Sequence, residues 1–230
     1  MSLPIILLAI VAAIVVGIFQ SSLFEWTFHR YWLHRPWEPK GIFNAHTMVH
    51  HQLCKFEDTF HVHDEEQHEA LHFQWWGGPV LVGINTVPWI LLSVGLWALG
   101  VPFPYVAFVG TLAGTIFVYY LGYETLHYQM HKPTIAAVTK SPYFRFIEKH
   151  HRIHHVHMDR NLNVLFPLAD LLLGTLVTKE EPSGPTPATA RTLARRHSLY
   201  GRRLRGEAPW PEGSERVETA APQASETLQK

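Results

Sequence analysis

The histidines between His150 and His157 are the residues of this chain best suited to chemistry, since five of those eight positions are histidine. On a helix, residues four apart share a face, so His151 and His155 would present two imidazoles side by side. The adjacent His154 points about 100° away from His155, which would let the same turn supply a second, neighbouring centre. Imidazole is the commonest metal ligand in proteins and suits iron, zinc and copper. The pattern therefore predicts a metal-binding helix.

Three further histidine groups stand earlier in the chain. With the last one, their patterns in chain order are HxxxxH, HxxxHH, HxxxH and HxxHH. The ten histidines of these four patterns are His29, His34, His46, His50, His51, His127, His131, His151, His154 and His155. Ten imidazoles are enough to hold two metal ions with about five ligands each, or two ions with open coordination positions. Because Mg²⁺ and Ca²⁺ prefer oxygen ligands, we expect transition metals.

The overall composition narrows the class of protein. The 230 residues include 19 Lys and Arg against 19 Asp and Glu, which gives no excess of positive charge for binding nucleic acid. The single cysteine, Cys54, can form no internal disulfide and belongs to no CxxC motif. Of the 17 histidines, only His197 lies outside the segment 29–157. This crowding indicates that the histidines serve one site.

Three apolar stretches are long enough to cross a bilayer as helices. Residues 3–24 contain no Asp, Glu, Lys or Arg and reach the length of about 20 residues that spans the hydrocarbon core. A cleaved signal peptide is the alternative, but the stretch lacks a positive beginning and a small-residue cleavage site. A second uncharged run covers 70–123, and the prolines and glycine of 100–104 divide it into a hairpin with arms at 79–99 and 105–123.

The distribution of positive charge predicts how these spans are oriented. Lys and Arg are absent from 1–24 and 70–126, whereas 25–69 has four and 127–179 has seven. By the positive-inside rule, both basic segments are expected in the cytoplasm, which places all four histidine patterns at the cytosolic membrane face. We therefore predict an all-α, polytopic membrane domain over residues 1–179. It would have about three transmembrane helices and a cytosolic helical cap carrying a histidine-rich two-metal site.

The remaining segments are not expected to span the membrane. Residues 163–177 are apolar but short, and they contain Pro167 and Asp170, which favours an interfacial or buried segment. From residue 180 the chain is rich in Pro, Ser, Thr, Ala, Arg and Glu and has few apolar residues. We predict that 180–230 is a disordered cytosolic tail.

The order of the four histidine patterns resembles that of the fatty acid hydroxylase and sterol desaturase superfamily, which consists of integral membrane di-iron oxygenases. The other positions similar to the family pattern are Glu25-Trp26, Asn161, Asn163 and the D-x-x-x-G-T segment at 170–175. The resemblance spans about residues 25–176. One histidine pattern alone would be weak evidence, but the ordered set is specific.

This resemblance implies a non-haem di-iron site that activates O₂ and inserts oxygen at a C–H bond of a membrane lipid, such as a fatty acyl, sterol or carotenoid substrate. It implies that the ten histidines above bind two iron ions. It also implies an external electron donor, such as a b-type cytochrome or a ferredoxin with its reductase, because the chain has no flavin or nicotinamide motif. Glu124, one turn before His127, and Asp170 are candidates to support the ligands through hydrogen bonds.

A further histidine group departs from the family pattern. Its members are His61, His63, His68 and His72, which lie among acidic residues. The last two are four apart and compete on spacing with His127 and His131, which we prefer because they extend the third span and have a family counterpart. We interpret the extra group as a solvated cap over the site, with support of the ligands and direct ligation as alternatives. His150 and His157 are interpreted as neighbours of the site.

The leading hypothesis is thus an oxidoreductase, a membrane monooxygenase that hydroxylates a lipid. Desaturation by the same site is the alternative, since hydrogen abstraction can also end in a double bond. A hypothesis of another class is a membrane metal transporter or metal-binding protein. Transporters place polar ligands near the bilayer midplane, whereas these spans are almost free of ionisable groups. A zinc hydrolase is disfavoured because the chain has no HExxH motif.

Overall fold

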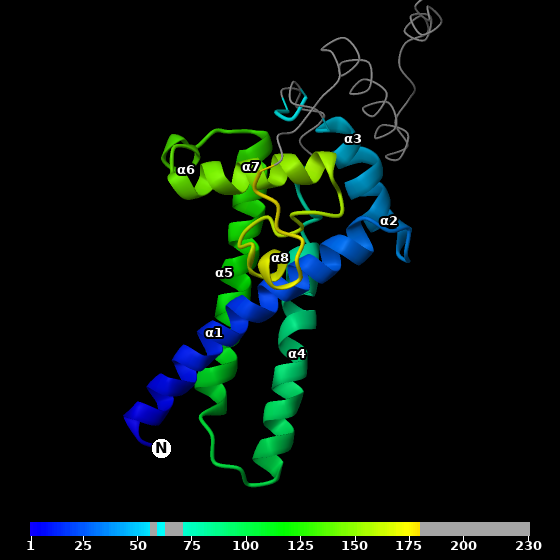
Figure 1. The fold of residues 1–230 in the computed structure, drawn as a ribbon. Coiled ribbons are helices and arrows are strands. Elements are labelled where there is room, and N and C mark those ends of the chain that lie inside the picture. Colours follow the sequence, from blue (N-terminus) through cyan, green and yellow to red (C-terminus); the bar gives the residue numbers. More distant parts are fainter. Residues whose placement is uncertain (56–58, 63–70, 180–230) are drawn as a thin grey trace, which may run out of the picture.

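The computed structural model describes residues 1–55, 59–62 and 71–179, and these residues form helices and loops without strands (Figure 1). The long helices are α1 (Leu3–Phe28), α4 (Gly77–Ala98) and α5 (Tyr105–His131). The shorter elements are the π-helices η1 (His29–Leu33) and η2 (Asn44–His50) and the α-helices α2 (Lys40–Phe43), α3 (His51–Leu53), α6 (Ala136–Thr139), α7 (Pro142–Val156) and α8 (Leu168–Leu172). The predicted tail at 180–230 lies outside the described residues.

Three helices are long and apolar enough to cross a membrane, as the sequence predicted. They are α1 continued through η1, together with α4 and α5. Glycine at position 100 ends α4 with a positive φ of 75°, a conformation that glycine adopts without steric cost. Residues on the outer faces are apolar and exposed, such as Val106 at 90%. Such a surface suits lipid rather than water.

Small residues allow α1 to cross close to α5. Ala9, Ala13 and Gly17 of α1 are buried, and the two alanines pack in a cluster with Leu112 of α5. A Cβ atom at Gly17 would stand only 2.9 Å from the Cβ of Thr115. Helices in a membrane gain van der Waals contact by such close approach. This crossing fixes the direction in which α1 enters the histidine-rich end of the molecule.

Hydrogen bonds join α1 to α4 within the apolar part. Gln20 Nε2 donates to the backbone carbonyl and to Oδ1 of Asn85, at 2.9 and 3.1 Å. Trp89 Nε1 donates to Gln20 Oε1 at 2.6 Å. Because a polar group in hydrocarbon needs an internal partner, these bonds hold the two helices in register.

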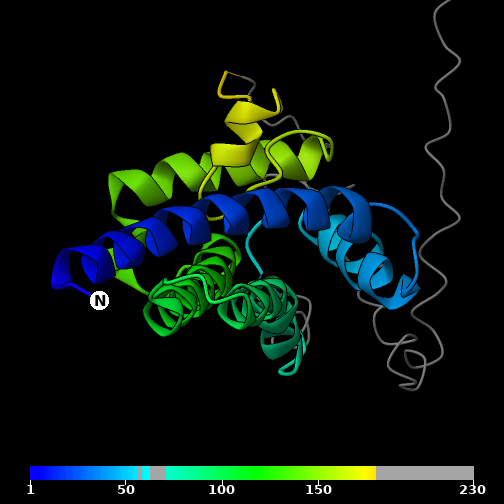
Figure 2. The ribbon, with the colours of Figure 1, turned by 90° about the horizontal axis from the view of Figure 1, so that it is seen from below.

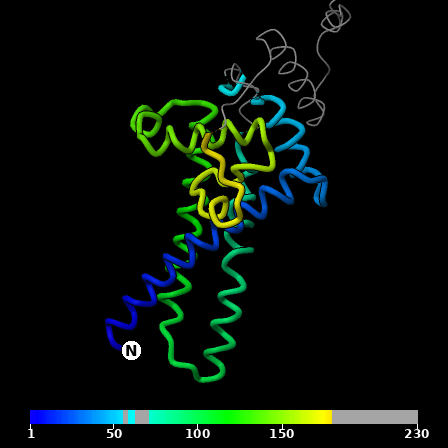
Figure 3. The backbone as a smooth tube through the Cα atoms, in the orientation of Figure 1, coloured from blue at the N-terminus to red at the C-terminus, as the bar shows by residue number. Residues whose placement is uncertain are grey.

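The shorter elements gather at one end of the three long helices (Figures 1 and 3). Figure 2 shows α1 between the α4–α5 hairpin and α8. Ser141 caps the start of helix α7: its side chain accepts a hydrogen bond from the Phe144 backbone N–H at 3.1 Å, and Pro142 takes the first helical position. Phe144 and Ile147 then pack against Met130 of α5. This contact brings the histidines of α7 beside those of α5.

Candidate metal centre

The ten predicted ligand histidines converge in two groups. The first histidine group consists of His29, His34, His46, His51 and His154. The second consists of His50, His131, His151 and His155, and His127 adjoins it with its Nε2 atom 3.2 Å from His50 Nε2. Among the five members of the first group, and among the first four members of the second, one ring nitrogen of every histidine lies within 4.8 Å of the others. All ten except His34 are buried.

Two π-helices bring residues five apart into the same group. An α-helix turns such residues away from each other, but a π-helix closes its hydrogen bonds from i to i+5, so they lie almost one above the other. The rings of His29 and His34 stack at a centroid distance of 4.9 Å around η1. At the end of η2, the Nε2 atoms of His46 and His51 are 3.1 Å apart. The five-residue spacing of these pairs was visible in the sequence. It does not predict a shared face if the segment is assumed to be an α-helix, which has 3.6 residues per turn.

Helix α7 serves both groups. His151 and His155 are four residues apart, and their Nε2 atoms are 3.0 Å apart in the second group. His154 turns to the first group, where its Nε2 lies 3.1 Å from that of His51. An adjacent histidine pair on one helical turn therefore reaches two centres, which is the arrangement expected from its spacing.

Backbone carbonyls orient four of the rings. The contacts run from His29 Nδ1 to Leu162 O, from His127 Nδ1 to Leu71 O (3.1 Å), from His131 Nδ1 to Phe60 O (2.8 Å) and from His154 Nδ1 to Arg160 O (2.7 Å). A carbonyl oxygen only accepts, so in each ring Nδ1 carries the proton and donates it. Each Nε2 then presents a lone pair to the interior of the site.

One contact in the first group is unfavourable without a cation. His34 Nδ1 donates to Thr47 Oγ1 at 2.9 Å, because that hydroxyl donates its own hydrogen to the Leu33 carbonyl at 2.6 Å. The Nε2 atoms of His34 and His154 are therefore both lone-pair atoms, and they are 3.0 Å apart. Burial, reinforced by His154, lowers the pKa of His34 to about 2, and burial lowers that of His154 to about 4. Neutral rings in this arrangement suit a transition-metal ion.

Asp170 holds the loop that presents the Leu162 carbonyl. Its oxygens accept hydrogen bonds from Leu162 N (2.8 Å), Asn163 N (2.7 Å), Thr175 Oγ1 (2.6 Å) and His150 Nε2 (3.1 Å). Burial alone would raise the pKa of Asp170. The hydrogen bonds to its carboxylate, with that from His150 the largest contribution, outweigh burial and lower this pKa below its ordinary value. Asp170 thus supports His29 through the backbone of Leu162 rather than by touching a ligand ring.

Glu25 ties the same loop to α1. One carboxylate oxygen accepts from the backbone N–H groups of Val164 and Leu165, and the other accepts from the Tyr119 hydroxyl at 2.7 Å and from Asn163 Nδ2 at 3.1 Å. A carboxylate offers about four lone-pair sites, so all of them are engaged. Its role is to position the loop. In the sequence, only the family resemblance pointed to Glu25.

Glu124 does not occupy its predicted place. We expected its carboxylate to accept a hydrogen bond from a ligand ring, with His127 one turn away. Instead, Glu124 Oε2 lies 3.3 Å from His72 Nδ1, and the carbonyl of Leu71 contacts the His127 ring. The Leu71 carbonyl, from a neighbouring loop, therefore accepts the hydrogen bond from a ligand ring that was expected to go to the Glu124 carboxylate. Sequence spacing cannot reveal such a backbone partner.

The other histidines surround the two groups without joining them in the described part of the chain. His61 Nε2 lies 3.4 Å from Glu148, and His150 contacts Asp170. His157 is exposed. His63 and His68 lie outside the described residues. The choice of His127 and His131 over His68 and His72 stays a prediction, because His68 is not among the described residues.

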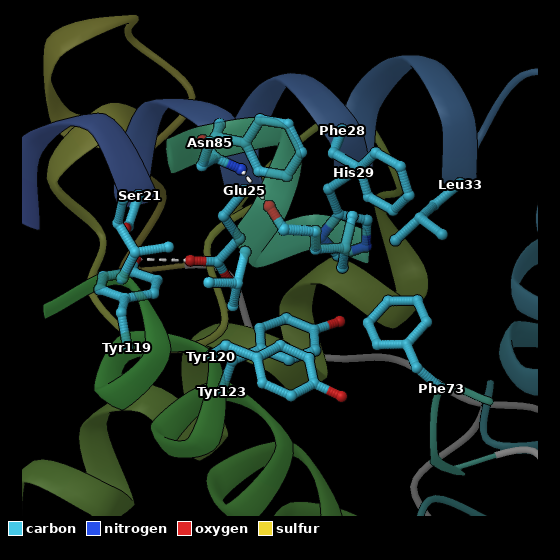
Figure 4. Close-up of a pocket in the computed structure, with 14 residues that line it drawn as sticks. Ser21, Glu25, Phe28, His29, Leu33, Phe73, Asn85, Tyr119, Tyr120 and Tyr123 are labelled. Atoms are coloured by element: carbon cyan, nitrogen blue, oxygen red, sulfur yellow. Dashed lines mark hydrogen bonds between the residues drawn. The ribbon is translucent and has the colours of Figure 1, made fainter. Parts of the chain in front are cut away.

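An apolar cavity of about 60 Å³ lies between α1, α4 and α5 (Figure 4). In that view Glu25 projects from α1 and His29 from the adjoining η1, and Tyr119, Tyr120 and Tyr123 project from α5. Because His29 lines the cavity and also belongs to the first histidine group, the cavity connects the long helices with that group.

The metal-free protein should lose stability as the pH falls below about 6.5. Burial lowers the pKa of His154 from 6.5 to about 4, and it shifts His50 and His151 in the same direction. Below pH 6.5 these histidines become protonated in the unfolded chain but stay neutral in the folded chain. The free energy of unfolding should therefore decrease by about 1.4 kcal/mol per pH unit for each such histidine, until its folded pKa is reached. Thermal unfolding of chelator-treated protein between pH 7.5 and 5 measures this. An unchanged midpoint over that range would contradict it.

Comparisons of the chain with protein-family models, with curated proteins and with solved structures found no match. The two histidine groups, the loop that orients them and the adjoining cavity are therefore the observations from which function is inferred.

Proposed function

We propose that this protein is a membrane-embedded, O₂-dependent di-iron hydroxylase that inserts oxygen at a C–H bond of a lipid. The observation that carries the proposal is the convergence of ten neutral imidazoles in two groups beside an apolar cavity among three membrane-capable helices. The first group would hold one iron ion, and the second group with His127 would hold the other. When bound, the two ions would supply the O₂ activation that oxidation of an unactivated C–H bond requires.

The chain's own residues would orient the ligand rings, shield the metal site from water and bind the lipid. Buried carbonyls fix which ring nitrogen faces the ions, and this pre-organisation spares the site from reordering during the reaction. Burial of nine of the ten rings excludes water from the two groups. The cavity wall formed by Phe28, Phe73 and Ile116 would align an apolar chain toward His29.

The stoichiometry of hydroxylation requires a partner that supplies electrons. Inserting one oxygen atom from O₂ and releasing the other as water consumes two electrons and two protons. The proposed source is an external donor such as a b-type cytochrome or a ferredoxin with its reductase. We place the histidine groups in a cap on the cytosolic face, because the basic segments before α4 and after α5 lie at the same end as these groups.

Lipid analysis of cells that express the protein tests the reaction. A hydroxylase adds one oxygen atom to a lipid, whereas a desaturase removes two hydrogens, and mass spectrometry separates these products. The purified protein should contain close to two iron ions per chain. Absence of iron together with absence of any oxidised lipid would overturn the proposal, and metal flux into vesicles without O₂ or reductant would favour a transporter instead.

Filling the cavity should block the reaction without emptying the metal site. Val82 lines the cavity on α4, so Val82→Phe would place a ring in the space proposed for the lipid chain. We expect product to fall at least about tenfold, the scale of one poorly accommodated group in an apolar pocket, with iron content unchanged. The matched control is Val80→Phe, two residues away at a 46% exposed position. Equal product from both variants would show that the cavity does not hold the substrate.

A further inference from the structure

Aromatic and arginine side chains cluster where α1 ends. The arginine–aromatic cluster consists of Trp26, Arg30, Tyr31, Arg35 and Trp37. The guanidinium of Arg30 lies 5.1 Å from the centre of the Trp26 ring, and that of Arg35 lies 5.0 Å from the Tyr31 ring. Tyr31 in turn stacks on Trp37 at 5.4 Å. The guanidinium of Arg30 also lies 6.0 Å from the Tyr31 ring, so this one ring has both arginines around it.

Neither arginine is neutralised by a carboxylate within the described ranges. The nearby Glu38 pairs with Lys40 at 3.5 Å. Stacking on a ring uses the face of a guanidinium and leaves the N–H groups at its edge free to donate. Arg30 is half-buried and Arg35 is exposed, so these edges can be reached from outside. Two such edges suit an anion with several acceptor oxygens, and phosphate is the best match.

The position of the cluster along α1 indicates where this phosphate would come from. Residues Leu3–Leu33 form a helix of 31 residues, which is about 46 Å long at 1.5 Å per residue. The hydrocarbon core of a bilayer is about 30 Å thick, and about 40–45 Å with its headgroup layers. Along its axis, α1 carries Arg30 about 40 Å from its apolar start, and because α1 is inclined to α4 and α5 (Figure 1), Arg30 would lie where the helix leaves the hydrocarbon core and enters the headgroup layer. Tyrosine and tryptophan are enriched at that depth.

We propose that the arginine–aromatic cluster binds the phosphate of an anionic phospholipid. The guanidinium edges of Arg30 and Arg35 donate to the phosphate oxygens, and Trp37, which is 46% exposed, lies against the glycerol and upper acyl region. Each arginine directly follows a member of the first histidine group, since Arg30 comes after His29 and Arg35 after His34. The bound lipid therefore steadies the segment that positions these two rings. This role is independent of the reaction proposed above.

Native mass spectrometry of the purified full chain tests the site. The probes are phosphatidylglycerol and phosphatidylcholine of equal chain length, added to protein in detergent. We expect the wild type to retain phosphatidylglycerol preferentially, and the Arg30→Gln/Arg35→Gln variant to bind it on the order of 30-fold more weakly. Arg30→Lys/Arg35→Lys should fall between the two, because lysine keeps the charge but loses the planar, two-pronged donor.

A charge-matched control separates a built site from general attraction to anionic lipid. Lys140→Gln/Arg145→Gln also removes two positive charges, from exposed positions at α6 and α7. We expect this variant to keep wild-type lipid binding. Equal loss in both double variants would overturn the proposal, because diffuse charge would explain it. If inorganic phosphate stabilised the protein as much as phosphatidylglycerol does, the proposal would also be overturned, in favour of a site for small anions.

The thermal unfolding midpoint of each variant in detergent reports whether it has folded. If the double variant fails this check, Arg35→Gln alone serves, because the Arg35 side chain is exposed and its loss leaves no buried gap. We expect that single change to weaken phosphatidylglycerol binding about fivefold. Unchanged binding in the folded single variant would overturn the contribution of Arg35 and with it the two-arginine site.

Discussion

Replacing His154 by alanine is expected to empty the first metal position and to abolish lipid oxidation. His154 Nε2 lies 3.1 Å from His51 Nε2 and 3.0 Å from His34 Nε2, so it faces two other members of its group. Loss of a partner that merely supports a ligand costs about 10–100-fold in metal affinity or activity. Loss of a ligand should therefore cost at least about 100-fold. Metal analysis of the purified variant and lipid mass spectrometry measure the two effects.

The matched control for this prediction is His157→Ala. His157 follows the same helix, is exposed and belongs to neither histidine group. Its replacement should leave metal content and product within about twofold of wild type, as expected for a change at a surface position. A His154→Ala protein that kept two metal ions and full activity would show that the first group is not a metal site.

Asp170→Ala is expected to cost on the order of 3–5 kcal/mol in the free energy of unfolding and to disorder the first histidine group. The substitution leaves four buried donors without their acceptor, among them the backbone N–H of Leu162 and the ring of His150. The Leu162 carbonyl would then no longer hold the proton on His29 Nδ1. Unfolding in detergent by a denaturant series measures the loss of stability, and metal analysis measures the loss at the site.

Two variants delimit the role of this carboxylate. Asp159→Ala removes an acid from the same segment, but its side chain is 72% exposed, so we expect a change within about 0.5 kcal/mol. Asp170→Asn keeps one acceptor oxygen and should be intermediate in both stability and metal content. Wild-type unfolding of Asp170→Ala would show that the loop is held by other contacts, with Glu25 the first candidate.

Helix length and helical periodicity made much of this architecture predictable. The three long helices follow from the length and composition of uncharged runs, because about 20 apolar residues match the hydrocarbon core whatever packs against them. The division of α7 between the two groups follows from the angular offset of His154 and His155. Such features depend on residues close in sequence, so they can be derived without the rest of the fold.

Other features of the site depend on contacts between distant segments. The π-helical turns pair His29 with His34, and this pairing runs against the α-helical rule used for the sequence. Glu124 was a candidate to contact a ligand ring, but its carboxylate lies beside His72, and the Leu71 carbonyl, 56 residues away, contacts the His127 ring. Likewise, only the resemblance singled out Glu25, whose role depends on a loop about 140 residues later.

The sequence by itself determined that ten imidazoles would occur in four patterns, two of them at the ends of membrane-length helices, since residue type, spacing and apolar length are local properties. The tertiary structure decided how those imidazoles divide into two groups and which nitrogen of His29 and of His154 faces inward. The physical reason is that ring orientation is set by backbone carbonyls. Their positions depend on how the loop after α7 packs against α1, and no pattern within either segment specifies that contact.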